Sequence, residues 1–398
     1  MLLVWNCVAT LEMLANIDLN DLRAKILSAY RADDDALSTF RQFARRLKSD
    51  VRPLRTYSAN AISFVSADGG DNRLVFNPAV IEVVRVVDSL NNPCVMDVVA
   101  GSISLAELES RAVKESPHAV PPLVRLSGDL GMRLGDLSYL FQSAGQPGKS
   151  RGILQTYRDI LEWSVLYDLI ANPQKSWGSD TILIRDGLLR TKSFRPDVFP
   201  KVDRKFRDAV DAHAQRNVAV SLVGVAKQSA VLSRLAVALE IEGTFGKAFP
   251  CFVPVPEDIE RECYRTDRFW METLETADED ETGRKSYQSM GRMYLVKFGD
   301  RPLDPVWPVD IAAWQTDHAE KILGQLTVDA QQGFPIPDYP MSIQRAHDFA
   351  KVGGIEMEIL QDFLIEGMCT TLDAEQSERL LRMKHLGRSL ASLRYKEA

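Results

Sequence analysis

Two Asp-Gly pairs, Asp68-Gly69 and Asp186-Gly187, constrain this chain most, because each follows a short run rich in apolar and β-branched residues that favours a strand. A glycine after a strand allows a sharp turn and leaves the preceding carboxylate facing a cleft. Two carboxylates in one cleft repel each other unless a cation lies between them, so the pattern favours a divalent-metal site. Asp-Gly is also an ordinary turn signal, and a purely structural role for each pair stays open.

Composition places the chain among folded proteins of a reducing compartment. The 398 residues are 45% hydrophobic, which is ample for a buried core. The five cysteines show no Cys-x-x-Cys spacing, which argues against a structural zinc and favours the cytoplasm. The apolar start lacks a basic region and is interrupted by Asn6 and Glu12, so we expect neither a signal peptide nor a membrane span.

The order of the predicted elements indicates an α/β fold with a mixed sheet flanked by helices. Three strand-like runs near residues 61–87 predict an antiparallel meander. Further along, helices at 152–171 and 198–216 each lead into a strand, an alternation typical of a layered α/β core. Helices are expected at both ends of the chain.

We expect two segments of different character. Residues 1–55 form a helical lead-in whose apolar start either joins the core or serves as a dimer or partner arm. Residues 56–398 form one elaborated domain, with an inserted segment at about 100–150 and an acidic loop at about 272–283.

Local charge differs from the overall balance. The net charge of -7 excludes a protein that coats nucleic acid through global electrostatics. Basic residues nevertheless gather at 41–55 and 185–207, and each run adjoins an Asp-Gly pair, where a polyanion would lie if the acids hold metal. We therefore expect Arg185, Arg190 and Lys192 to contact a nucleic acid, although basic runs are often solvated faces.

Two further residues suit the same chemistry. Glu162 lies beside the apolar stripe of the helix that leads into the second Asp-Gly strand, where an acid can point into a cleft. His347 lies on a predicted helix that follows Tyr339-Pro340, and a neutral imidazole can bind Mn²⁺ or pass a proton to a leaving oxygen. Taken singly, a solvated glutamate and a surface histidine remain the alternatives.

Together, Asp68, Glu162, Asp186 and His347 match the needs of a two-metal phosphodiesterase. One cation lowers the pKa of the attacking water and the other stabilises the leaving oxygen, at a separation of about 3.5–4 Å. Oxygen ligands favour Mg²⁺ or Mn²⁺, and a histidine shifts the preference toward Mn²⁺.

At these residues the chain resembles the NurA nucleases, which have an RNase H-like core and process DNA ends beside the HerA hexameric ATPase. Five short motifs occur in the family's order between about residues 60 and 350, at Val65–Gly70, Arg158–Glu162, Ile182–Leu189, Val223–Ser229 and Tyr339–His347.

The resemblance implies an RNase H-like mixed sheet and a Mn²⁺- or Mg²⁺-dependent deoxyribonuclease. It implies that the four acidic and histidine residues serve the metal, that Tyr339 orients substrate or a ligand, and that Lys227 contacts the scissile phosphate. It also implies a homodimer with DNA as substrate and a HerA-like translocase as partner. This chain departs from the family at Gly70, where a small hydroxyl residue is common, and in its long insert.

Two rival functions remain. A non-catalytic NurA-like subunit that regulates an ATPase would be favoured by a missing metal ligand. A metal phosphohydrolase acting on small nucleotides would be indifferent to DNA length, and the basic runs argue against it.

Overall fold

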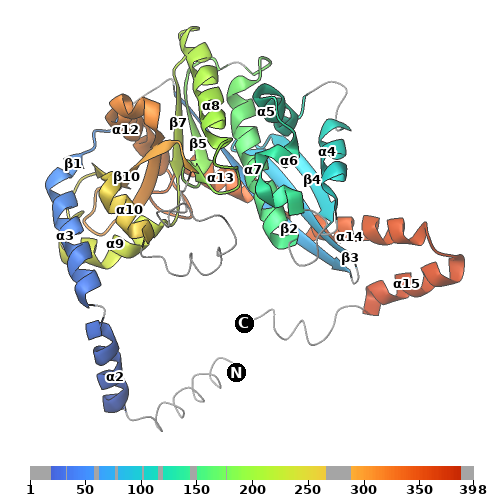
Figure 1. The fold of residues 1–398 in the computed structure, drawn as a ribbon, viewed down its shortest axis with the longest axis horizontal. Helices are drawn as coiled ribbons and strands as arrows, with labels where there is room; N and C mark the ends of the chain where they lie inside the picture. The colour runs from blue at the N-terminus through green and yellow to red at the C-terminus, as the bar shows by residue number, and fades with distance from the viewer. Residues whose placement is uncertain are drawn as a thin grey trace. The chain divides into compact units, whose positions relative to one another are not determined.

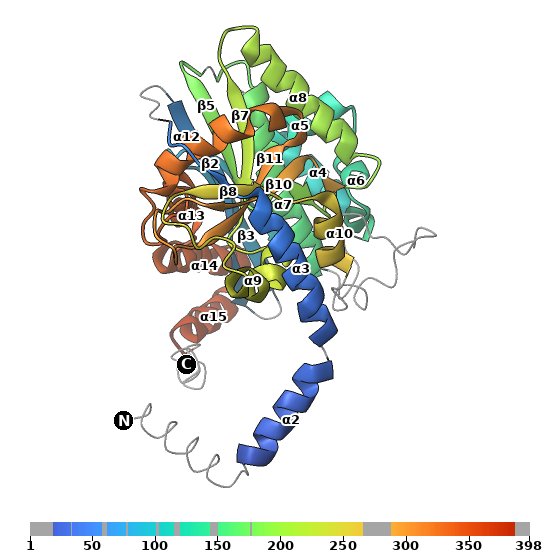
Figure 2. The same ribbon diagram turned by 90° about the vertical axis from the view of Figure 1, so that its left-hand side faces the viewer.

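The computed structural model describes residues 19–32, 34–57, 62–76, 79–100, 103–114, 120–143, 150–175, 177–265 and 288–386. The expected N-terminal apolar arm and acidic loop lie outside these residues. The chain divides into two compact units, whose elements are drawn in Figures 1 and 2. The first unit comprises 1–55, 226–283 and 292–309, and the second comprises 56–225, 284–291 and 310–398.

The first unit combines helices with short strands. Strand β8 pairs antiparallel with β1 and with β10. Helix α9 begins at Ala230 because Ser229 caps it, its Oγ accepting from the Leu232 N–H at 2.9 Å. The elements are α2 (Leu19–Ala32), α3 (Asp34–Asp50), β1 (Arg52–Pro53), α9 (Ala230–Ile241), β8 (Cys251–Pro254), α10 (Glu257–Arg265) and most of β10 (Gly291–Lys297).

The basic run on α3 is used within this unit. Arg41 and Arg45 both pair with Glu242, at 2.7 and 3.0 Å, and Arg46 pairs with Asp258 at 2.5 Å. Figure 2 shows α3 together with α9, whose C-terminal end precedes Glu242. These contacts give the predicted nucleic-acid run a structural role in joining helices.

The second unit contains the mixed sheet. Its strands lie in the order β7-β5-β2-β3-β4. Strands β2, β3 and β4 form an antiparallel meander, and β5 and β7 run parallel to β2. A meander followed by two parallel strands is the RNase H-like arrangement, so the predicted fold class is confirmed. The bounds are β2 (Ile62–Phe76), β3 (Ala79–Asp88), β4 (Pro93–Ala100), β5 (Asp180–Asp186) and β7 (Val220–Val225).

Helices cover this sheet (Figure 1). The predicted apolar stripe of α7 is buried against the strands, and Trp163 packs edge-on against Phe199 and Phe206 of α8. Fully burying side chains of this size stabilises the fold by about 1.5–3 kcal/mol each. The helices are α4 (Leu105–Lys114), α5 (Pro122–Leu130), α6 (Leu134–Leu137), α7 (Ser150–Ala171), α8 (Phe199–Ala214), α12 (Ala319–Ala330), α13 (Met341–Ala350), α14 (Gly354–Cys369) and α15 (Ala374–Leu386).

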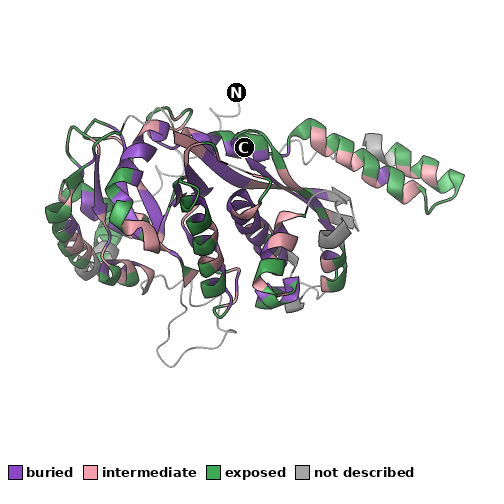
Figure 3. Ribbon diagram, turned by 90° about the horizontal axis from the view of Figure 1, so that it is seen from above, coloured by how far each residue is buried: buried purple, intermediate pink, exposed green. Residues whose placement is uncertain are grey.

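Smaller elements complete the description. Strand β6 (Arg190–Thr191) pairs with β9 (Gln288–Ser289), and β11 spans Val306–Ala312. Two 3₁₀-helices cover Tyr139–Ser143 and Ala313–His318. Figure 3 shows the strands largely buried and helices α14 and α15 mostly exposed. Among the described helices, none combines the length and apolar character that crossing a bilayer requires.

The structure corrects the expected strand ends. Residues 61–67 and 73–76 were predicted as two strands, but β2 runs through Asp68-Gly69 without a turn, because Gly69 and Gly70 pair with β3. The third strand of the meander is therefore β4, which the sequence did not indicate. The second Asp-Gly pair does end its strand, and Gly187 there adopts a positive φ of 116° that favours glycine.

Candidate metal centre

Three predicted residues converge on one face of the sheet. Asp68 lies on β2, Asp186 ends β5 and His347 lies on α13. One ligand atom from each lies within 4.8 Å of the other two. The parallel register that pairs Ala67 with Arg185 also places the two aspartates side by side. The structure thus brings together the side chains that a shared cation requires.

The setting of Asp68 in this cluster suits a cation. The Asp68 side chain is only 11% exposed, and its Oδ2 lies 2.8 Å from His347 Nδ1. Burial and then the charge of Asp186 raise the pKa of Asp68, while the hydrogen bond from His347 works in the opposite direction. Two carboxylates and an imidazole are donors that Mn²⁺ or Mg²⁺ accepts, so the residues fit such an ion.

Tyr339 supports the second aspartate. Its side chain is fully buried, and its hydroxyl lies 3.1 Å from Asp186 Oδ1 and 3.2 Å from the Val225 carbonyl. Burial and the nearby Asp186 raise the pKa of Tyr339, so the hydroxyl stays protonated and donates. The amide of Gln344 donates to the Tyr339 carbonyl at 2.9 Å and so fixes the segment that carries the ring.

Polar contacts hold helix α13 at both ends. At its start, Asp329 accepts from the N–H and the hydroxyl of Ser342, at 3.1 and 2.6 Å. At its end, Arg85 on β3 donates to the carbonyls of Ala350 and Lys351. The positive charge of Arg85 there interacts favourably with the negative end of the helix dipole. These contacts fix the backbone that presents His347.

Gly70 allows this helix to approach β2 closely. A Cβ built at Gly70 would lie 2.1 Å from the Ala350 carbonyl oxygen, so no larger residue fits here. The departure from the family's small hydroxyl residue therefore has a physical reason in this chain.

Glu162 lies near this cluster but on the other face of β2. A Cβ built at Gly69 would meet Glu162 Oε1 at 2.5 Å, whereas one built at Gly70 would meet α13. The carboxylate is flanked by Arg158 at 3.4 Å and Arg185 at 3.6 Å. Burial raises the pKa of Glu162 to about 8, although the charge of Arg185 lowers it. Glu162 is not part of the three-residue cluster, and its metal role remains a prediction.

Two residues expected to contact nucleic acid are buried instead. Arg185 donates to Asp159 at 2.5 Å and stacks on Trp163, with the guanidinium 4.8 Å from the ring centre. Arg190 is held by two hydrogen bonds to buried Asp310, at 2.7 and 2.8 Å. Both side chains therefore have structural contacts within the protein, and their contact with nucleic acid stays a prediction.

The other two expected contacts remain at the surface. Lys192, just after β6, is exposed in the second unit. Lys227 follows β7 and is exposed in the first unit. Their roles toward a nucleic acid stay predictions.

Sequence reasoning missed three residues around the site. Arg158 and Asp71 form an ion pair beside Glu162, and Arg85 secures the end of α13. The spacing of Arg158 and Glu162, four residues apart on one helix, was the available signal. Arg85 carried no such signal, since its partners follow it by 265 and more residues.

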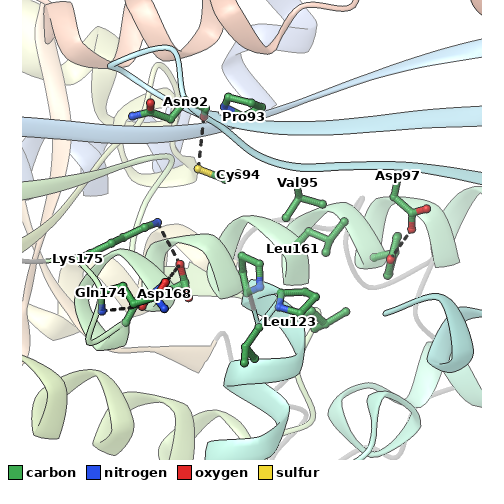
Figure 4. A pocket seen from close by; sticks show the side chains of 15 residues that line it. Asn92, Pro93, Cys94, Val95, Asp97, Leu123, Leu161, Asp168, Gln174 and Lys175 are labelled. Carbon is green, nitrogen blue, oxygen red and sulfur yellow. Dashed lines mark hydrogen bonds and ion pairs between the residues drawn. The ribbon is translucent and has the colours of Figure 1, made fainter. Parts of the chain in front are cut away.

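A separate cavity of about 400 Å³ lies between β4, α5 and α7 (Figure 4). Its acids already have partners within the protein. Asp168 pairs with Arg125 at 2.6 Å and with Lys175 at 3.0 Å, and Asp97 accepts from the Tyr157 hydroxyl at 2.6 Å. Burial raises the pKa of the Cys94 thiol there to about 11, which leaves it unreactive. This cavity therefore offers no metal centre comparable with the cluster on β2 and β5.

The chain shows only limited similarity to known proteins. No model of a protein family matches the sequence, and no curated protein sequence matches it. The structure is similar to the NurA nuclease from Sulfolobus solfataricus at 12% identity, covering 88% of this chain and 98% of that one with a TM-score of 0.33. NurA bound to dAMP and manganese is 11% identical, with 90% of this chain and 98% of that one covered and a TM-score of 0.36. NurA with manganese is 11% identical, with 88% of this chain and 99% of that one covered and a TM-score of 0.38. Such low scores assign no activity.

Proposed function

We propose that the protein is a metal-dependent nuclease that hydrolyses phosphodiester bonds of DNA with Mn²⁺ or Mg²⁺. One observation carries this proposal. Asp68, Asp186 and His347 come from three separate elements and present ligand atoms within 4.8 Å of one another on an RNase H-like sheet. Bringing acids this close costs energy unless a cation joins them.

In this proposal each residue of the chain has a distinct task. Asp68 and Asp186 hold the cation, and Tyr339 keeps Asp186 oriented by donating to its Oδ1. His347 either binds the cation or gives a proton to the leaving oxygen. The cation, when bound, supplies Lewis-acid stabilisation and lowers the pKa of the attacking water. Glu162 completes the site if its carboxylate moves past Gly69.

A direct test compares the parent with Asp68→Asn and His347→Ala. Linear DNA is incubated with Mn²⁺, with Mg²⁺ and with EDTA, and products are resolved over time. We expect the parent to cut only with a metal and both variants to lose cleavage, with circular dichroism unchanged. Parental cleavage by Asp68→Asn would remove this site assignment.

Details of the reaction are also part of the proposal. We propose exonuclease activity on DNA ends, with single-strand endonuclease activity as a further expectation. Substrates blocked at one end, closed circles and RNA of the same sequence separate these activities. Equal cleavage of RNA and DNA would overturn the choice of substrate.

We further propose that the protein works as a homodimer beside a HerA-like hexameric translocase. Exposed apolar residues support an assembly, because Ile355, Ile359 and Phe363 form a stripe along α14 with 77%, 47% and 62% exposure. Light scattering of the parent and of Ile359→Glu tests the dimer. A monomeric parent would overturn it.

The alternative is a non-catalytic subunit that regulates an ATPase. The pairing of Glu162 with Arg158 and Arg185 favours this alternative, because those cations already compensate the acid. Metal binding without any cleavage, together with a change in the ATPase rate of an added translocase, would support it.

A further inference from the structure

Arg158 stands out among the residues that surround the site. It lies on α7 one helical turn before Glu162, and its side chain is 37% exposed. One terminal nitrogen pairs with Asp71 on β2. The Nε lies 3.4 Å from Glu162 Oε1 but is buried and makes no hydrogen bond among the described residues. A buried donor without an acceptor costs free energy, so this nitrogen is suited to an acceptor from a ligand.

The neighbouring Arg185 also has a buried Nε without a hydrogen bond among the described residues, but its terminal nitrogens are held within the protein. Its side chain is 11% exposed, and it donates to the Leu188 carbonyl and to Asp159 at 2.7 and 2.5 Å. It also stacks on Trp163. Arg185 is therefore fixed within the protein, and Arg158 is the guanidinium beside Glu162 that solvent reaches.

Charge around Arg158 connects it to the metal cluster. Burial tends to lower the pKa of Arg158, but the charges of Glu162, Asp71 and Asp68 outweigh burial and raise it. The guanidinium thus stays protonated beside the same Asp68 that belongs to the cluster. Its partner Asp71 follows Asp68 by three residues on β2, so the guanidinium lies beside the strand that carries the cluster.

We propose that Arg158 binds a non-bridging oxygen of the scissile phosphate. The inference rests on the proposed nuclease function. In the reaction one water adds to phosphorus, the bond from phosphorus to the leaving oxygen breaks, and that oxygen takes a proton. Charge on the non-bridging oxygens is stabilised by a planar guanidinium, which donates from two edges. Asp71 keeps the guanidinium oriented while Nε exchanges Glu162 for the phosphate.

Two variants and a matched control test this role. Arg158→Ala and Arg158→Lys are compared with Arg73→Ala, which removes an arginine of β2 that is 48% exposed and pairs with Glu82. We expect Arg158→Ala to lower the rate of DNA cleavage by about 100-fold, as loss of one preorganised donor does. Arg158→Lys should restore part of the rate, and Arg73→Ala should cleave like the parent.

Binding measurements separate contact with phosphate from support of the metal site. Calorimetry should give Mn²⁺ affinities for Arg158→Ala within about twofold of the parent. With Ca²⁺ in place of Mn²⁺, the slope of log affinity for single-stranded DNA against log salt should fall by about 0.7, the loss of one phosphate contact. Thermal unfolding confirms that each variant is folded, and Arg158→Gln replaces any that is not.

The outcomes are distinguishable. If the parent cleaves DNA and Arg158→Ala cleaves at the same rate, the inference fails and the proposed function stands. If Mn²⁺ affinity and cleavage fall together, Arg158 supports the metal site and does not touch phosphate. A parent that does not cleave DNA overturns the proposed function and this inference with it.

Discussion

The two faces of β2 carry acids in opposite electrostatic settings. Toward α13, Asp68 meets Asp186, and the one basic group in the cluster is the His347 imidazole. Toward α7, Glu162 lies between the guanidinium groups of Arg158 and Arg185. Two consecutive glycines of β2 face these two sides, since Gly69 faces Glu162 and Gly70 faces α13.

This difference indicates which face needs a cation from outside. On the α7 side Glu162, Asp71 and Asp159 share the guanidinium groups of Arg158 and Arg185, so the protein itself places cations beside these acids. On the α13 side the carboxylates of Asp68 and Asp186 lie beside the His347 imidazole, and burial and Asp186 raise the pKa of Asp68. The comparison therefore favours metal binding on the α13 side and phosphate binding beside it.

The strongest test of the comparison is Asp186→Asn. The change removes one metal ligand, and loss of several kcal/mol of transition-state stabilisation corresponds to about a 1000-fold loss of cleavage. It also removes the charge that raises the pKa of Asp68, so the metal-free protein should unfold at the same temperature as the parent or a higher one. Scanning calorimetry in EDTA and in Mn²⁺ measures this effect. Strong destabilisation in EDTA would indicate a structural acid instead.

A second test compares Gly70→Ala with Gly69→Ala. The new methyl at Gly70 meets the Ala350 carbonyl at 2.1 Å, which is backbone, whereas at Gly69 it meets the Glu162 side chain, which can rotate. Overpacking of this kind costs about 1–3 kcal/mol, and we expect Gly70→Ala at the upper end and Gly69→Ala at the lower end. Urea unfolding gives both values. The opposite order would mean that the α13 backbone at Ala350 moves away from β2 more easily than the Glu162 side chain rotates.

The third test uses pH. Because the pKa of Glu162 is raised to about 8 from its ordinary 4.5, protonation of the native state contributes stability that is fully present below pH 4.5 and is lost as pH rises through 8. Metal-free parent protein should lose at least about 1.4 kcal/mol more than Glu162→Gln between pH 5 and pH 9, the equivalent of one pKa unit. Urea unfolding in EDTA at both pH values checks this. Identical pH dependence would show that the two arginines keep Glu162 ionised.

Much of this arrangement could be predicted from local sequence patterns. The β-branched run at 79–87 forms β3, and the periodic apolar residues of α7 are buried as expected. The end of β5 at Asp186-Gly187 was also predictable from the local sequence, because Gly187 adopts the positive φ that glycine allows. Asp68-Gly69 has the same dipeptide and no turn, since pairing with Val87 and Val86 on β3 keeps it extended. A neighbouring strand thus overrode a turn signal.

Charge partners were the part that the sequence could not show. Arg185 and Arg190 belong to a basic run of the kind that contacts nucleic acid. Their partners Asp159 and Asp310 lie 26 and 120 residues away in the sequence. Only the folded chain shows that these cations are already neutralised. The same limit applies to Glu162, whose helix position was predictable but whose two guanidinium neighbours, and whose face of β2, depend on the packing of α7.

The smallest expected effect separates orientation of a ligand from stability. Tyr339→Phe removes the hydroxyl that contacts Asp186 and the Val225 carbonyl, at a cost of about 1 kcal/mol in the free energy of unfolding. Loss of a group that orients a metal ligand lowers metal affinity by about 10-fold or more. Tyr167→Phe is the matched control, because its hydroxyl donates to Asp129 at 2.7 Å away from the cluster. Equal Mn²⁺ affinities for the two variants would show that Asp186 is oriented without Tyr339. The hydrogen bond from the Tyr339 hydroxyl would then have no part in binding the cation on the α13 side of β2.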